Sequence, residues 1–173
     1  SQALQRTAHD GVYLKKLNKF YSFGGFDLNT PLGDLLMFDL NASKWTNLSA
    51  ISIKTSVNIT DPLFAQNPSP KAEPPSARYG HTMEPLGDGF VLYGGQLTDG
   101  SFSDELFYYD ALTNEWKLLA TNSQIRPPAL SRHTLAVIND SLVYVFGGST
   151  ANGEFSSNLY SIDIDIKGKY LSM

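Results

Sequence analysis

Short stretches in which apolar and polar residues alternate recur along the chain, and three of them end in a pair of glycines. The three stretches are FYSFGG at 20–25, FVLYGG at 90–95 and VYVFGG at 143–148. Alternation with a period of two, in runs rich in Val, Phe and Tyr, is typical of β-strands that bury one face. No stretch has the 3.6-residue period of an amphipathic helix. The pattern therefore predicts an all-β protein.

The segments around the three glycine pairs are copies of one unit, each with four short strand signals. A histidine precedes each glycine pair, an aspartate follows it by 14 or 15 residues, and in two units a tryptophan follows that aspartate by six residues. We interpret the shared residues as structural repeat positions. They are His9, Gly24, Gly25, Asp39 and Trp45 in the first unit, Arg78, His81, Gly94, Gly95, Asp110 and Trp116 in the second, and His133, Gly147, Gly148 and Asp163 in the third.

Each shared residue type has a structural role that its chemistry explains. Glycine ends the second strand where the backbone needs an unusual φ or a close approach. The aspartate can accept backbone N–H bonds in the turn before the fourth strand. The three histidines belong to different units, so a repeat architecture keeps them apart, and we expect them to pack between units rather than to share a metal or a substrate.

Paired glycines, an Arg-x-x-His start at Arg6 and Arg78, and an aromatic-Asp pair followed by Trp resemble the Kelch repeat. The resemblance implies that each unit is a four-stranded blade of a β-propeller. The third unit departs from the pattern, with Leu130 at the arginine position and no tryptophan. Because propellers typically need four to eight blades, three blades predict a fragment of a six- or seven-bladed ring.

The unit boundaries follow from this alignment. We expect blades at 1–48, 78–119 and 131–173, the last irregular or truncated at its end. A proline-rich insertion at 49–77 and a connection at 120–130 separate them.

The composition argues against several kinds of partner and of catalytic or metal site. The net charge of -4 and the scattered basic residues argue against nucleic acid as a partner. No apolar run reaches 18 residues, so we expect no direct membrane insertion by this segment. The absence of cysteine removes disulfides, thiolate nucleophiles and cysteine zinc sites, and with them the Cys-linked tyrosine of the Kelch-like galactose oxidases. We therefore predict no catalytic residue, no metal and no cofactor. An enzyme that takes catalytic groups from further blades remains an alternative.

The up-and-down order of strands in a blade places the loops between second and third strands on one face of the ring, together with the connections between blades. Loops on a rigid scaffold usually carry function, so we expect a protein partner there. Further blades, from the same or another chain, are the other predicted partners. The candidate partner-binding residues are Phe26, Asp27, Asn29, Phe64, Gln96, Asp99, Phe102, Asn152 and Phe155.

Four N-x-[ST] sequons, where roughly two are expected by chance, indicate a glycoprotein. Their asparagines are Asn41, Asn47, Asn58 and Asn139, all in predicted turns or loops. The stretch from Arg78 to Asp110 is similar to the repeats of the attractin and multiple-EGF-like membrane proteins. This resemblance implies a non-enzymatic interaction scaffold in an extracellular or secretory location. The alternative is a cytoplasmic Kelch adaptor that recruits substrates to a ubiquitin ligase or organises the cytoskeleton.

Overall fold

The computed structural model of the chain describes residues 5–49, 73–119, 127–139 and 141–164, and these contain β-strands and no helix. In chain order the strands are β1 (Asp10–Leu14), β2 (Lys19–Phe23), β3 (Leu35–Asp39), β4 (Lys44–Asn47), β5 (Arg78–Tyr79), β6 (Thr82–Leu86), β7 (Gly89–Tyr93), β8 (Gln96–Leu97), β9 (Leu106–Asp110), β10 (Glu115–Leu118), β11 (Thr134–Ile138), β12 (Leu142–Phe146) and β13 (Leu159–Asp163).

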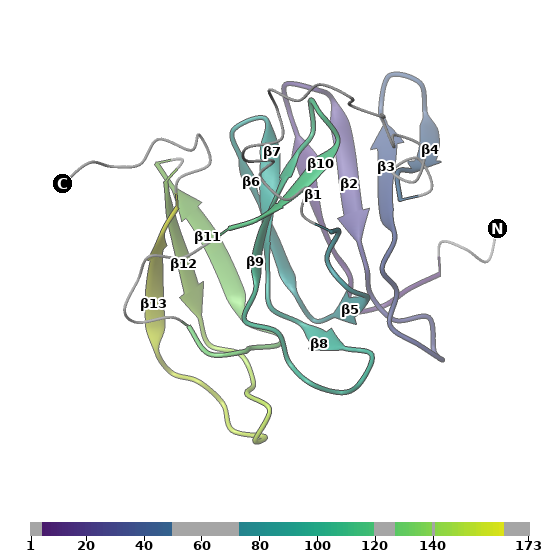
Figure 1. Cartoon of the computed structure of the whole chain (residues 1–173). Coiled ribbons are helices and arrows are strands. Elements are labelled where there is room, and N and C mark those ends of the chain that lie inside the picture. Colours follow the sequence, from purple (N-terminus) through teal and green to yellow (C-terminus); the bar gives the residue numbers. More distant parts are fainter. Residues whose placement is uncertain (1–4, 50–72, 120–126, 140, 165–173) are drawn as a thin grey trace, which may run out of the picture.

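The longer strands form one antiparallel up-and-down sheet in each repeat unit (Figure 1). The first sheet has the order β1-β2-β3-β4, the second has β6-β7-β9-β10, and the third has β11-β12-β13. The predicted fourth strand of the third unit, at 169–171, lies outside the described residues. The all-β propeller-fragment prediction is confirmed, with two blades of four strands and a third of three strands among the described residues.

The first strands of the three sheets lie next to one another. Strand β6 contacts β1 on one side and β11 on the other, and the sheets stand side by side in chain order (Figure 1). This is the arrangement of neighbouring propeller blades, in which the first strand of each blade is the one nearest the ring axis.

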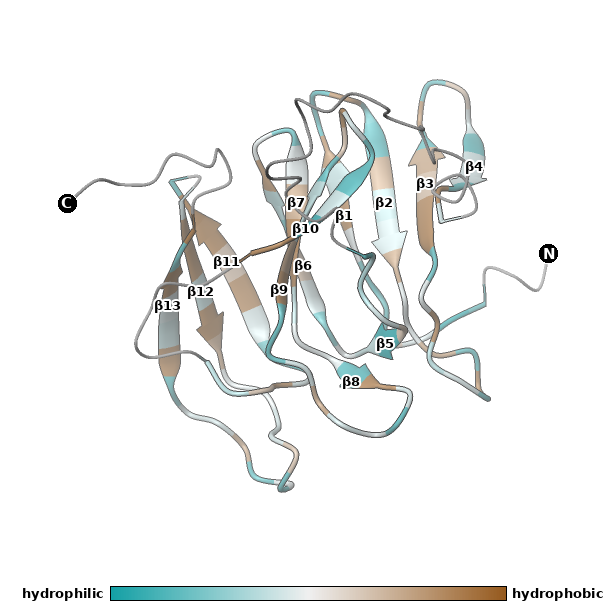
Figure 2. Ribbon diagram, in the orientation of Figure 1, coloured by the Kyte–Doolittle hydropathy of each residue, from teal (hydrophilic) through white to brown (hydrophobic). Residues whose placement is uncertain are grey.

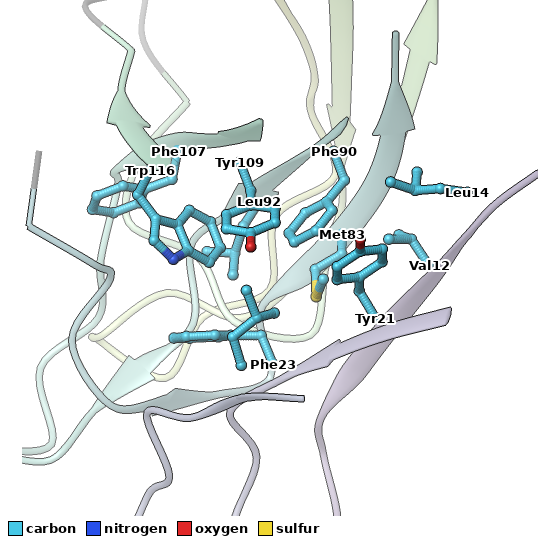
Figure 3. Packing of buried hydrophobic residues seen from close by; sticks show 11 residues of the cluster. Val12, Leu14, Tyr21, Phe23, Met83, Phe90, Leu92, Phe107, Tyr109 and Trp116 are labelled. Carbon is cyan, nitrogen blue, oxygen red and sulfur yellow. The ribbon is translucent and has the colours of Figure 1, made fainter. Parts of the chain in front are cut away.

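The hydrophobic core lies between the sheets. The first and second sheets enclose an aromatic cluster in which the Trp116 ring lies 4.9 Å from the Tyr109 ring and 5.5 Å from the Phe23 ring (Figure 3). A second cluster, which includes Tyr93, Leu106, Val143 and Ile162, fills the space between the second and third sheets. Apolar residues accordingly concentrate on the strands (Figure 2). The facing sides of neighbouring sheets therefore bury each other.

A short ribbon between β5 and β8 was not predicted from the sequence, which indicated a loop at 96–104. Tyr79 pairs with Gln96 in this ribbon, and isolated bridges join Thr7 to Phe26 and Ser131 to Ser149 at the equivalent positions. The ribbon is thus a repeated feature that ties the start of each unit to the loop after its second strand.

The first glycine of the first two pairs marks a close approach between neighbouring units. A Cβ atom on Gly24 would lie 2.5 Å from the Arg78 carbonyl oxygen, and one on Gly94 would lie 2.5 Å from the Leu130 carbonyl oxygen. Both glycines also have a positive φ. At these positions a side chain would push the next blade away.

The substitution Gly94→Ala is therefore expected to destabilise the fold well beyond the cost of a positive φ. Gly100→Ala is the matched control, because Gly100 also has a positive φ but its Cβ would meet nothing within 4 Å. We expect Gly100→Ala to lower the free energy of unfolding by about 1–2 kcal/mol. Gly94→Ala should cost about 1–3 kcal/mol more, through the clash. Urea unfolding measures both, and equal losses would show that the close approach does not limit stability.

Candidate functional site

The loops and the turns lie at opposite ends of the strands, and so on opposite faces of the row of three sheets. The loops at 26–34, 96–104 and 149–157 lie on one face, which we call the loop face (Figure 1). The hairpin turns that join first to second and third to fourth strands lie on the other, which we call the turn face. Irregular backbone of variable sequence gathers on the loop face, so this is the candidate functional site.

In each of the first two units, a buried arginine side chain fixes the two ends of the loop after the second strand. Arg6 donates to both carboxylate oxygens of Asp34 at 2.7 and 2.9 Å and to the Gly24 carbonyl at 2.9 Å. Arg78 repeats this arrangement, with 2.9 Å to Glu105 and 3.2 Å to the Gly94 carbonyl. Each arginine therefore holds the glycine pair against the residue that precedes the third strand.

Arg78 has no exposed surface, and its guanidinium also lies 5.3 Å from the centre of the Phe107 ring. Burial lowers the pKa of Arg78 from its ordinary value, while the Glu105 carboxylate acts in the opposite direction. The ion pair thus holds a charged group inside the molecule, and Arg78 also donates to the Ser76 carbonyl and the Ser103 hydroxyl, which makes it part of the framework.

Short turns hold the loop tips. The Asp27 carboxylate accepts the backbone N–H groups of Asn29 and Thr30, and that of Asp99 accepts the N–H and the hydroxyl of Ser101. Hydrogen bonding lowers the pKa of both aspartates, from the Thr30 backbone to Asp27 and from the Ser101 side chain to Asp99. Both carboxylates therefore stay charged into the acid range, and they fix the shape of the tips.

Two large apolar side chains project from the loop face into solvent. Leu28 and Phe155 are each 87% exposed. Leu28 also has a φ of 83°, a conformation that costs a leucine about 1–2 kcal/mol. Sequence reasoning named Phe155 but missed Leu28. The available signal was the position of Leu28 between Asp27 and Asn29, two residues typical of turns.

Of the other predicted partner-binding residues, some pack within the loops and some lie exposed at the loop tips. Phe26 is half-buried, with its ring 5.3 Å from that of Tyr79, and Gln96 bonds to Tyr79 and to the Gly100 carbonyl. Phe102 is half-buried and forms a bridge with Gln96. Asn29 and Asn152 are exposed at loop tips. Phe64 lies outside the described residues.

The histidines lie where one unit meets the next. The His81 ring packs 5.6 Å from the Phe23 ring of the preceding unit, and the His133 ring packs 5.2 Å from the Tyr93 ring. Burial, helped by the charge of Arg78, lowers the pKa of His81 to about 3, and burial lowers that of His133 to about 4. Both rings are therefore neutral at physiological pH.

The described residues contain no group of three or more His, Cys, Asp or Glu side chains with the geometry of a metal site. Nor does the described part of the chain contain a helix that is long and apolar enough to cross a bilayer.

Three of the four sequon asparagines are described, and all three are exposed. Asn41 and Asn139 lie in hairpin turns on the turn face. Asn47 is the last residue of β4 rather than part of a loop, and its side chain accepts the Ser49 N–H at 3.0 Å. Asn58 lies outside the described residues. Asn41 and Asn139 therefore lie away from the loop face, whereas Asn47 pairs with Leu36 near the end of β3 that adjoins it.

Comparison with known proteins agrees with this geometry. The family model of the Attractin/LZTR1 beta-propeller matches residues 52–171, which is more than half of the chain. The chain belongs to this beta-propeller family. Both the Kelch-type resemblance and the likeness to attractin-type repeats are thus confirmed.

Among the curated relatives, human Multiple epidermal growth factor-like domains protein 8 is 32% identical over 158 residues. That alignment covers 90% of this chain and 5% of the human protein, so the chain spans a small part of the relative. Tip elongation aberrant protein 1 of Schizosaccharomyces pombe is 30% identical, over 92% of this chain and 17% of that protein. Human Kelch domain-containing protein 3 is 25% identical, over 84% of this chain and 36% of that protein.

The buried histidines of this propeller make its stability depend on pH. An unfolded histidine has a pKa near 6.5, so between pH 6.5 and 4 the unfolded state binds more protons than the folded state. Stability should therefore fall as the pH drops through this window, by up to about 1.4 kcal/mol per pH unit for each buried histidine. Urea unfolding at pH 7, 6 and 5 measures this slope.

Two variants assign that slope to residues. His81→Gln cannot titrate and should remove about half of it. His133→Gln should remove most of the remainder, because its ring is the second buried imidazole. A slope that His81→Gln does not alter would contradict the assignment.

Proposed function

We propose that this chain is a non-enzymatic protein-interaction module, part of the extracellular propeller of an attractin-like membrane protein, that binds a protein partner through its loop face. The observation that carries the proposal is the exposure of Leu28 and Phe155 on the loop face, where Leu28 lies in the Asp27 turn and the Phe155 backbone forms a bridge with Ser149. A large apolar side chain in a preset conformation loses little entropy on binding, which is typical of an interface anchor.

The charge of the loop face indicates the kind of partner. The three loops contain five carboxylates and no lysine or arginine. Asp34 is paired with Arg6, which leaves Asp27, Asp99, Asp104 and Glu154 facing outward. A partner surface with lysine or arginine around an apolar centre complements this pattern. The 49–77 connection, which was also expected to contribute, lies mostly outside the described residues.

Two observations support the extracellular assignment. Over 90% of its own residues, this chain is similar to Multiple epidermal growth factor-like domains protein 8. Asn41 and Asn139 lie on the turn face, so that glycans at these two positions would leave the loop face uncovered.

An intracellular Kelch adaptor is the second candidate. The similarity to Kelch domain-containing protein 3, and to a yeast protein whose name refers to tip elongation, favours it. In both candidates the loop face is the binding surface, and only the compartment and the partner differ.

Replacing the two apolar anchors is expected to weaken partner binding without loss of fold. Leu28→Ser and Phe155→Ser should each reduce affinity at least about tenfold, because truncating an interface anchor costs more than 1 kcal/mol. The partner would first be isolated by quantitative capture on the immobilised chain, and Kd would then be measured with the purified partner at two salt concentrations. Affinity should fall at the higher salt concentration.

Leu112→Ser provides the matched control, because Leu112 is an exposed leucine in the turn between β9 and β10, on the turn face. It should bind like the unchanged chain. Equal binding by all four proteins would exclude the two side chains as anchors.

Glycan occupancy of the sequons would distinguish an extracellular from an intracellular location. We expect N-glycans on Asn41 and Asn139 in protein from its native source, because both residues are exposed in hairpin turns. Peptide mass spectrometry before and after enzymatic deglycosylation measures the occupancy. Bare asparagines at all four sequons would favour the intracellular adaptor.

A further inference from the structure

The tip of the third loop carries the single Asn-Gly pair of the sequence, Asn152–Gly153. Both residues are exposed on the loop face. Glycine has no Cβ atom, so it does not shield its own backbone nitrogen from the side chain of the residue before it. An asparagine side chain can therefore react with that nitrogen more readily than with the nitrogen of any other residue type.

The third loop turns at this pair in the same way as the second loop turns at its own glycine. The Gly153 N–H donates to the Thr150 carbonyl at 3.0 Å, and the Gly100 N–H donates to the Leu97 carbonyl at 3.0 Å. The two glycines have φ values of 80° and 85°. The two loop tips thus share one backbone conformation and lie on the same face of the molecule (Figure 1).

The residue before the glycine distinguishes the two tips. In the second loop it is Asp99, whose carboxylate accepts the Ser101 N–H at 2.9 Å and the Ser101 hydroxyl at 2.6 Å. In the third loop it is Asn152, whose side chain has no hydrogen-bond partner among the described residues. The space beside Gly153 is open, because a Cβ atom there would meet nothing within 4 Å. The Asn152 amide can therefore rotate toward the Gly153 nitrogen, whereas the Asp99 carboxylate is held.

We propose that Asn152 is a site of spontaneous deamidation, by which the loop face gains a carboxylate. The Gly153 nitrogen gives up its proton and attacks the Asn152 Cγ atom. A new C–N bond closes a succinimide ring, the bond from Cγ to Nδ2 breaks, and the departing nitrogen takes up a proton and leaves as ammonia. Water then opens the ring at one of its two carbonyl groups, which gives aspartate or isoaspartate. The net reaction consumes one water, releases one ammonia and involves no oxidation.

The turn at Gly153 must open for this reaction, because its N–H is bonded to the Thr150 carbonyl. Such opening costs little free energy at an exposed loop tip that has few contacts with the rest of the molecule. The aspartate product fits the closed turn, since the second loop already has Asp99 at that position. The reaction adds one negative charge to a face whose three loops contain five carboxylates. Any effect of this charge on a basic partner rests on the proposed function.

Incubation of the 173-residue chain at neutral pH and physiological temperature tests the proposal. We expect peptide mass spectrometry to show conversion of Asn152, and ion-exchange chromatography to show the gain of one negative charge. The rate should be within about tenfold of that of a synthetic peptide of residues 149–157, because the tip opens easily. It should rise with pH, because the attacking nitrogen must lose a proton. The measurement needs no partner, so its outcome is independent of the binding proposal.

Asn29 is the internal control. It is exposed at the tip of the first loop but precedes Thr30, whose branched side chain shields the attacking nitrogen. We expect Asn29 to stay intact over the same period. An intact Asn152 in the folded chain while the peptide converts would overturn the proposal, as would equal conversion of Asn29 and Asn152.

Two variants test the role of the unbonded side chain. Asn152→Gln keeps the amide but would need to close a larger ring, so the charge gain at this loop should disappear. Asp99→Asn introduces a second Asn-Gly pair on the same turn, where Ser101 can donate to the new amide oxygen. This second pair should convert more slowly than Asn152. Equal rates at the two positions would contradict the role assigned to the missing hydrogen bond.

Discussion

The contact between neighbouring sheets is the constraint on which the rest of this structure depends. A four-stranded blade is one layer thick and cannot bury its own apolar faces, so its core forms only where two blades meet. The backbone approaches most closely at the glycine pairs, where Gly25 and Gly95 donate to carbonyl groups of the following unit. A side chain at Gly24 or Gly94 would fill that space. The glycine pairs thus set the spacing between blades, and the aromatic clusters fill the gap that this spacing leaves.

The repeat unit keeps its fold where both members of a buried ion pair are replaced together. In two units a buried arginine is matched by an acidic residue, as with Arg78 and Glu105. In the third unit Leu130 is fully buried at the arginine position and Asn158 is exposed at the acidic one. Replacing both members of a buried ion pair avoids the penalty of an unpaired charge, and well-packed apolar residues stabilise such a site equally well. The third unit therefore keeps the fold after losing the Arg-x-x-His start.

Sequence reasoning could predict the framework because the framework repeats. Strands, glycine pairs and the sheet order follow from spacing that occurs three times, and chance matches are excluded by that recurrence. The loop face was harder. Phe26 and Leu28 are neighbours of similar hydrophobicity, yet Phe26 packs on Tyr79 and Leu28 projects into solvent. Which of two such residues faces outward depends on a partner far away in the sequence, and on a positive φ that leucine rarely adopts.

The division between a repeated framework and exposed loop tips explains how such a scaffold can acquire a binding function without changing its fold. Arg6 and Arg78 fix where each loop leaves and re-enters its sheet, and the Asp27 and Asp99 turns fix the tips. The residues at the tips themselves touch little else in the molecule, so a substitution there costs little stability. Binding specificity can therefore vary at the tips, while selection for the blade–blade contacts holds the positions from which they project.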